Sequence, residues 1–326
     1  METRLRSGWA IPRQVLLLGA AVGLVLIAAF VAVLWWAGAA AAVALGMGFL
    51  AGTRPATPLN PRHAIALALP AALAGAVGVG LRGQPFAAAC FVALCCVMTA
   101  PAEIRQAGLL AGMPTAAAVL VSVPGSYDPA LTAIWMIAGS ALLVAIFVVA
   151  KLPRSAASGT PPKRAWRHAA VMAVSVGIVV YLVQFHGLSH GYWVAVTLTV
   201  VLQPRHDLTR TKARQRILGT VGGVVLALLL VEVLPPWGIT LALAAGLVLM
   251  SCYAMLNDYV RQVVFLTSSI VLLAPAGGAG LIAAERAVAT VIGTLLAGAL
   301  AVLLERTDPG EQPAPVRGDS DQHPGG

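Results

Sequence analysis

Apolar stretches recur along almost the whole chain, from Gln14 to Glu305, with short polar or basic segments between them. A helix needs about 20 apolar residues to cross a bilayer, and the nearly uncharged stretch from Gln14 to Thr53 is long enough for two. The pattern predicts six spans in the first half, at approximately 14–34, 36–53, 63–81, 85–101, 107–123 and 129–151. It predicts six more in the second half, at 168–184, 191–203, 217–234, 237–256, 262–275 and 284–304. The predicted fold class is an all-α polytopic membrane protein with about twelve transmembrane helices in two six-helix pseudo-repeats.

The composition agrees with this prediction. The chain is 59% hydrophobic and 10% charged, with a mean hydropathy of +0.88, whereas a soluble domain has roughly 25% charged residues. The first apolar run exceeds the roughly 7 to 15 residues of a signal-peptide core, so we interpret it as a retained helix. The four cysteines, Cys90, Cys95, Cys96 and Cys252, lie in apolar runs and indicate packing residues, with no disulfide framework.

The distribution of basic residues tests the predicted topology, because Lys and Arg collect on the cytoplasmic side of membrane proteins. With both termini in the cytoplasm, 19 of the 21 basic residues fall on that side, and only Arg82 and Arg286 fall outside. The partition predicts a multi-pass plasma-membrane protein with cytoplasmic termini, whose main partner is the lipid bilayer. It also accounts for the net charge of +9 without a nucleic-acid partner.

The chain divides into two halves at a basic, Pro- and Ser-containing segment. The predicted organisation is a first membrane half (1–151), a cytoplasmic linker (152–167), a second membrane half (168–305) and a C-terminal tail (306–326) whose composition indicates disorder. Features of the first half recur in the second at an offset of 154 to 157 residues, as Trp36 and Trp193 or Arg62 and Arg216 do. The halves are therefore interpreted as diverged copies, an organisation found in transporters.

A finer pattern lies within the second half. The segments "RILGTVGG" (216–223) and "RAVATVIG" (286–293) both consist of Arg, three residues, Thr, two residues and Gly, which places these positions on one helix face. The two motifs lie at the starts of the predicted spans 217–234 and 284–304. These spans enter the membrane from opposite sides, as an inverted three-helix repeat requires. The spans 191–203 and 262–275 would also correspond, and both are short. Thirteen residues give about 20 Å of helix against a core of about 30 Å, and paired short helices indicate a transport site.

The second half also carries a family resemblance. The segments "GYWVAVTLTVVLQP" (191–204) and "TKARQRILGTVGG" (211–223) resemble the signature of the fusaric acid resistance and aromatic acid exporter superfamily, and are similar to a region of plant aluminium-activated malate transporters. "ERAVATVIGTLLAG" (285–298) fits the closing helix of that family. The resemblance covers roughly 166–305 and implies export or conduction of organic anions, often aromatic carboxylates. Two features differ: the linker is much shorter than the cytoplasmic domain of larger bacterial relatives, and the first half has "AIALALPA" (64–71) in place of "ILGTVGGV" (217–224).

Eight residues are candidates for substrate binding: Arg286, Thr290, Arg216, Thr220, Tyr192, Trp193, Thr197 and Gln203. The arginines would bind a carboxylate, or would instead anchor the topology by extending toward the interface. The aromatic pair would stack on an aromatic substrate, or would instead anchor the helix at the interface. Thr197, Thr199 and Gln203 would line a polar path, or the threonines would bond to their own helix. Asp258 is interpreted as a helix cap in preference to a proton-coupling carboxylate.

The predicted function is gradient-driven transport, most simply export, of a small organic anion. A channel-like anion conductor and a non-transporting scaffold subunit stay open as alternatives, and homo-oligomerisation is also left open. The sequence contains no phosphate-binding loop and no hydrolase motif, so neither an ATP-driven pump nor an enzyme is indicated, and no cofactor is predicted. His186 and His190 have metal-ligand spacing but no acidic or Cys partner nearby in the sequence, so no metal site is predicted.

Overall fold

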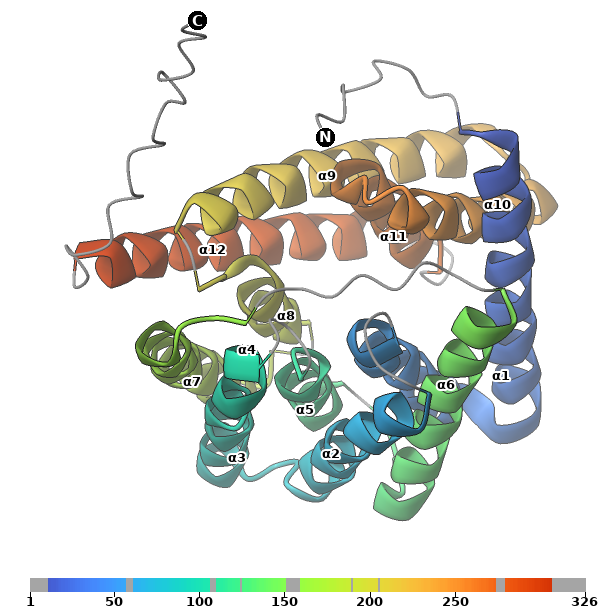
Figure 1. The fold of residues 1–326 in the computed structure, drawn as a ribbon. Helices are drawn as coiled ribbons and strands as arrows, with labels where there is room; N and C mark the ends of the chain where they lie inside the picture. Colours follow the sequence, from blue (N-terminus) through green and yellow to red (C-terminus); the bar gives the residue numbers. More distant parts are fainter. Residues whose placement is uncertain are drawn as a thin grey trace, which may run out of the picture.

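The structure, a computed structural model, is built of α-helices and has no β-strand among the residues it describes, which are 11–56, 61–105, 110–123, 125–150, 159–188, 190–204, 206–273 and 279–306 (Figure 1). The helices are α1 (Arg13–Ala56), α2 (Pro61–Gly80), α3 (Pro85–Val97), α4 (Ala100–Arg105), α5 (Gly112–Ser122), α6 (Pro129–Val149), α7 (Pro162–Phe185), α8 (Tyr192–Val201), α9 (His206–Val233), α10 (Pro236–Met255), α11 (Tyr259–Leu272) and α12 (Ala279–Arg306). The all-α fold class is confirmed. The predicted tail beyond Arg306 and the first part of the predicted linker lie outside the described residues.

The helix α1 contains the first two predicted spans. Its backbone leaves the helical conformation at Gly38, where φ is 86° and ψ is 177°. A glycine adopts this positive φ without the steric penalty that a Cβ atom would bring. Trp35 and Trp36, just before the break, are 92% and 83% exposed, as residues at a membrane interface would be. The turn between the predicted spans 14–34 and 36–53 is therefore found close to the tryptophan pair, and Figure 1 shows the bend in the chain.

Helix length and composition make this chain a multi-pass membrane protein. Within the described ranges, eight helical segments are long and apolar enough to cross a bilayer, with α1 counted once and α3 joined to α4. Three further apolar helices, α5, α8 and α11, are shorter. The count of twelve crossings stays a prediction, because the length of a short helix does not show whether it crosses.

Several helices begin earlier than the apolar pattern predicted, and α7 and α9 do so by the most residues. α7 starts at Pro162, a proline in the first turn being compatible with a helix, so residues 162–167 of the predicted linker are helical. α9 starts at His206, so the basic segment just before the predicted span 217–234 forms its first turns. These two helices extend beyond their apolar parts for the same reason. Lys and Arg are good helix formers, and a helix can continue into water after its apolar part has ended.

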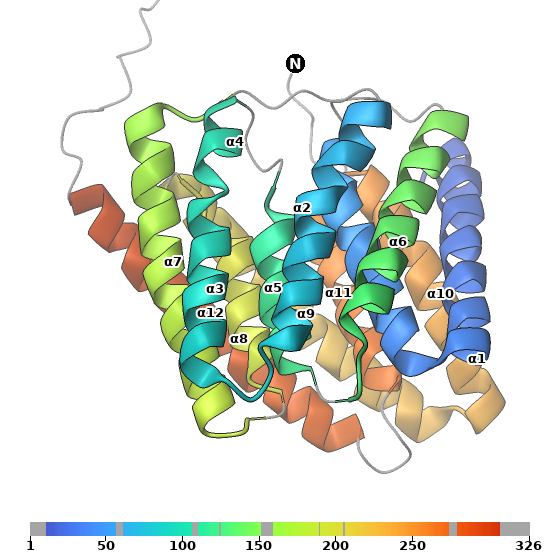
Figure 2. The ribbon, with the colours of Figure 1, turned by 90° about the horizontal axis from the view of Figure 1, so that it is seen from below.

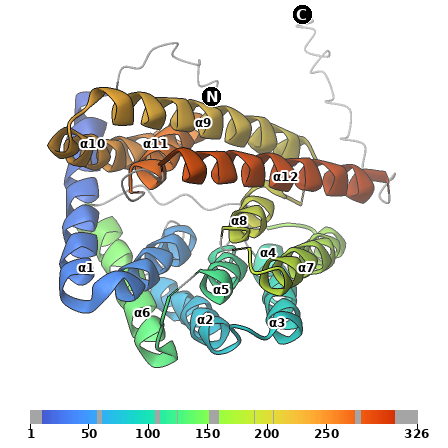
Figure 3. The same ribbon diagram turned by 180° about the vertical axis from the view of Figure 1, so that it is seen from behind.

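The two long helices α9 and α12 pack side by side and run in opposite directions across one side of the molecule (Figure 3). α11 packs on α9, and α8 packs on α12. The repeat pattern predicts an interface between the two halves that includes these four helices, but among the described helices only α8 of the four packs extensively on the first half, against α5. Turned by 90°, the helices α7, α3, α2, α6 and the first arm of α1 stand roughly upright in front of them (Figure 2).

Corresponding helices of the two halves meet in the same pairs. α2 packs on α5 and α6 in the first half, and α9 packs on α11 and α12 in the second. In the same way α1 packs on α6, and α8 packs on α12. The halves are joined where α3 meets α7 and where α1 meets α10. This correspondence supports the two six-helix copies, which remain a prediction.

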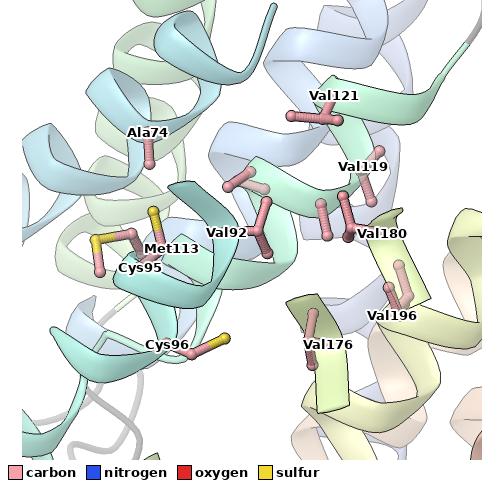
Figure 4. Close-up of a cluster of buried hydrophobic side chains, with 14 of the residues drawn as sticks. Ala74, Val92, Cys95, Cys96, Met113, Val119, Val121, Val176, Val180 and Val196 are labelled. Atoms are coloured by element: carbon pink, nitrogen blue, oxygen red, sulfur yellow. The ribbon is translucent and has the colours of Figure 1, made fainter. Parts of the chain in front are cut away.

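The main hydrophobic core lies where helices of both halves converge (Figure 4). It is built from small and β-branched side chains, including Val92 of α3, Val119 of α5, Val176 of α7 and Val196 of α8. Small residues allow helix backbones to approach closely, which is the main source of packing energy where lipid supplies no hydrophobic driving force. α5 and α8 are thereby held in the interior of the bundle.

Arg82, one of the two basic residues on the predicted outer side, has a structural role. Its Nε donates to the carbonyl of Leu120 at 2.8 Å, and one Nη donates to the carbonyl of Gly125 at 2.6 Å. The guanidinium also lies 4.1 Å from the centre of the Tyr127 ring. Arg82 therefore satisfies carbonyls at and beyond the C-terminal end of α5, which explains a cation on this side.

Candidate functional site

The candidate site begins at the aromatic pair of α8. Tyr192 and Trp193 are the first two residues of this helix, with ring centres 4.9 Å apart. The guanidinium carbon of Arg286 lies 4.0 Å from the centre of the Trp193 ring. A cation over an indole face is attracted by the ring quadrupole, and the attraction is stronger where water is excluded. Trp193 therefore fixes the position of Arg286 within the protein.

Arg286 itself is almost completely enclosed. The residue is 1% exposed, and its three guanidinium nitrogens have no hydrogen-bond partner among the described residues. Burying a cation whose N–H donors have no acceptor costs several kcal/mol of stability. The attraction to one aromatic ring offsets only part of this cost. A bound anion would supply the negative charge and the hydrogen-bond acceptors that this guanidinium lacks.

The neighbouring Glu285 does not neutralise Arg286. Its Oε2 lies 2.6 Å from Nδ1 of His190, in the segment that leads into α8. Adjacent residues on a helix point in different directions, as expected from the sequence. The acidic residue next to His190 in space could not be recognised from the sequence, because ninety-five positions separate the two. Among the described residues, no group of three or more metal-ligating side chains is found.

Arg216 is the second buried cation of the site. It lies within α9, ten residues after the start of the helix, and is 4% exposed with an unpartnered Nε. It is close enough to Arg286 for the two positive charges to act on one another. Two buried arginines near each other would repel in the empty protein, and a bound anion would relieve this repulsion.

Buried hydroxyl groups lie on the same helices as the two arginines and on α8. Thr220 and Thr290, one turn after Arg216 and Arg286, are 1% and 3% exposed. Thr197 of α8 is fully buried, and its hydroxyl lacks a hydrogen-bond partner, as does that of Thr220. Because buried hydroxyls are normally hydrogen-bonded, this group of unpartnered ones is an additional indication of a polar ligand.

Gln203 and Thr199 serve the structure instead. The side-chain amide of Gln203 donates to the carbonyls of Val200 and Leu202 at the C-terminal end of α8. The hydroxyl of Thr199 is 3.0 Å from that of Thr115 in α5 and also bonds to the carbonyl of Val196 in its own helix. Gln203 lies at the end of α8 opposite to Trp193, so the structure does not bring it together with Arg286.

The second half contains further buried polar side chains that the sequence did not single out. Thr267, Ser269 and Thr294 are buried with unpartnered hydroxyls, and the hydroxyl of Tyr259 is also buried without a partner. Tyr259 is the first residue of α11 and acts electrostatically on Arg286. Asp258 just before it caps α11 by accepting from the backbone N–H of Arg261, as the sequence suggested. For Thr267 and Ser269 a signal was present, since they occupy the repeat positions of Thr197 and Thr199.

Comparison with known proteins confirms the resemblance for the second half of the chain. Residues 176–300, from the middle of α7 into α12, match the family described as fusaric acid resistance protein-like. The chain is 33% identical over 111 residues to an uncharacterized protein of Haemophilus influenzae, which covers 33% of this chain and 15% of that protein. It is 28% identical over 142 residues to the inner membrane protein YccS of Escherichia coli, covering 42% of this chain and 19% of YccS.

A third relative, the uncharacterized protein ORF2 of Neisseria gonorrhoeae, is 37% identical over 60 residues, which cover 18% of this chain and 14% of that protein. This chain thus matches less than a fifth of the length of each of these three relatives. No solved structure matches the chain.

Proposed function

We propose that this membrane protein, whose second half matches the fusaric acid resistance protein-like family, transports small organic anions across the membrane. The observation that carries the proposal is the buried guanidinium of Arg286, which has three unpartnered nitrogens. An anion is the ligand that would satisfy both its charge and its donors. Carboxylate fits best, because a guanidinium and a carboxylate form two parallel hydrogen bonds.

The aromatic pair supports aromatic carboxylates as the substrate class. One face of Trp193 is covered by Arg286, and the Tyr192 ring lies beside it. A carboxylate at Arg286 would bring an attached ring next to these side chains, where offset or edge-on contacts are favourable. Thr290 and Thr197 would supply hydroxyl hydrogen bonds, and Arg216 would add a second positive charge. The driving force is the gradient of the anion or of protons, and the direction is export.

Uptake into proteoliposomes tests this function directly. Purified protein reconstituted into vesicles is expected to take up radiolabelled benzoate faster than protein-free vesicles do. Unlabelled 4-hydroxybenzoate should compete strongly, and acetate weakly, because acetate lacks the ring. The proposal fails if neither benzoate nor malate enters faster than in protein-free vesicles. Competition by acetate as strong as that by 4-hydroxybenzoate would remove the preference for aromatic anions.

The predicted orientation has its own test. In a background without native cysteines, Ser158→Cys in the predicted linker is expected to resist a membrane-impermeant thiol reagent in intact cells and to react once the cells are lysed. The expectation follows from the basic residues on both sides of position 158, which favour the cytoplasm. Gly83→Cys, in the turn between α2 and α3 on the predicted outer side, is the control and should react in intact cells. Modification of position 158 in intact cells would show that the predicted orientation is wrong.

A further inference from the structure

Residues seventy positions apart in the second half make the same contact in space. A Cβ atom added to Gly293 of α12 would lie 2.7 Å from Cβ of Thr197 in α8. A Cβ atom added to Gly223 of α9 would lie 2.7 Å from Cβ of Thr267 in α11. The carbonyl nearest to each glycine also corresponds, being that of Val194 in one case and Val264 in the other. The inverted repeat expected from the Arg, Thr and Gly pattern is thus present in the packing of the helices.

The correspondence extends to the chemistry of the site. Arg216 and Arg286 are 4% and 1% exposed, and the threonines one turn later, Thr220 and Thr290, are 1% and 3% exposed. Thr197 and Thr267 are both fully buried with unpartnered hydroxyls. Each repeat therefore contributes one arginine and two buried threonines to the interior.

The glycine of each contact is displaced along its helix from the two neighbouring arginines. Arg286 precedes Gly293 by seven residues, and Arg216 precedes Gly223 by seven residues, which is about 10 Å along a helix. Because α9 and α12 run in opposite directions (Figure 3), these displacements point to opposite faces of the membrane. The contacts Thr197–Gly293 and Thr267–Gly223 therefore lie on opposite sides of the neighbouring arginines, and both contacts are closed in this structure.

We infer that Arg286 with Thr290 and Arg216 with Thr220 form two halves of one anion site related by the inverted repeat, and that the two Thr–Gly contacts on either side of this site open in turn. The protein then works as an alternating-access carrier. An anion bound at the two arginines leaves toward one side of the membrane only when the contact on that side loosens, and the pseudo-symmetry makes the two end states similar in energy. This inference rests on the proposed anion transport and adds its mode.

Counterflow distinguishes a carrier from an open pore. Proteoliposomes preloaded with unlabelled benzoate are expected to accumulate labelled benzoate several-fold faster than empty vesicles, because a loaded carrier returns more readily than an empty one. Equal uptake by loaded and empty vesicles would overturn the inference while leaving anion transport intact. An absence of any benzoate flux would overturn the proposed function and this inference with it.

Reversible cross-linking tests the contacts themselves. In a background with the four native cysteines replaced by alanine, the pairs Thr197→Cys with Gly293→Cys and Gly223→Cys with Thr267→Cys can form disulfides after a small separation of the helices. Oxidation is expected to lower benzoate uptake at least about tenfold for each pair, and reduction should restore it, which shows that the protein is folded. The matched control is Gly52→Cys with Ser140→Cys on the corresponding helices α1 and α6, where a Cβ at Gly52 would lie 3.3 Å from Cβ of Ser140. Undiminished uptake after complete cross-linking of either second-half pair would contradict the inference.

Discussion

Replacing Arg286 with glutamine is expected to lower benzoate uptake by about a hundredfold at equal amounts of reconstituted protein. Glutamine keeps a polar side chain but removes the charge and the paired donors, and charge-assisted hydrogen bonds contribute about 1.5–3 kcal/mol each. Arg286→Lys should recover only part of the activity, because an ammonium group replaces the planar fork with a single charged centre. Initial rates at several benzoate concentrations, measured in proteoliposomes, check both expectations.

Thermal stability provides the control for this variant. Arg286 is buried with unpartnered nitrogens, so removing its charge is expected to leave the empty protein as stable as before, or more stable. The wild type should gain stability from benzoate, and Arg286→Gln should lose that gain. A variant that transports normally would show that Arg286 is not the anion-binding cation. A variant that loses transport and unfolds at a much lower temperature would indicate a structural role instead.

Replacing Gly48 with alanine is expected to reduce the folded protein sharply, lowering the unfolding midpoint in detergent by about 5 to 10 °C. A Cβ atom at Gly48 of α1 would overlap the backbone carbonyl of Met136 in α6, and a backbone cannot rotate away as a side chain can. Overpacking of this kind costs about 1–3 kcal/mol, and 1 kcal/mol shifts the midpoint by a few degrees in a protein of this size. Fluorescence-detected thermal unfolding measures the shift.

Two further glycines serve as comparisons for Gly48. Gly139 of α6 meets the Leu45 carbonyl in the same interface, so Gly139→Ala should behave like Gly48→Ala. Gly298 of α12 has no heavy atom within 4 Å of an added Cβ, and Gly298→Ala should be neutral or slightly stabilising, because alanine favours a helix by about 1 kcal/mol. Equal midpoints for Gly48→Ala and Gly298→Ala would show that α1 and α6 do not need this close approach.

The sequence determined the features of this protein that depend on local composition. Apolar runs and basic residues predict an all-α multi-pass membrane protein. A long apolar segment can form all of its backbone hydrogen bonds within lipid by itself only as a helix. The family resemblance of the second half is carried by the aromatic pair, Arg216 and the Gly-Thr pattern. Thr220 and Thr290 were recognised because a threonine four residues after an arginine lies on the same helix face. Helix ends were less predictable, since the start of α9 at His206 depends on helix propensity beyond the membrane.

Only the tertiary structure decided how these residues are partnered. Glu285 pairs with His190, and Arg286 packs on Trp193. The partners in both contacts are more than ninety residues apart in the chain. Gln203 looked like a lining residue but bonds to the end of its own helix. Thr267 and Tyr259 entered the site through the packing of α11 against α9. The hydrophobic pattern determines which residues enter the membrane. The partner of a buried polar group depends instead on which helices are in contact, and those contacts depend on close approaches at single glycines such as Gly223 and Gly293.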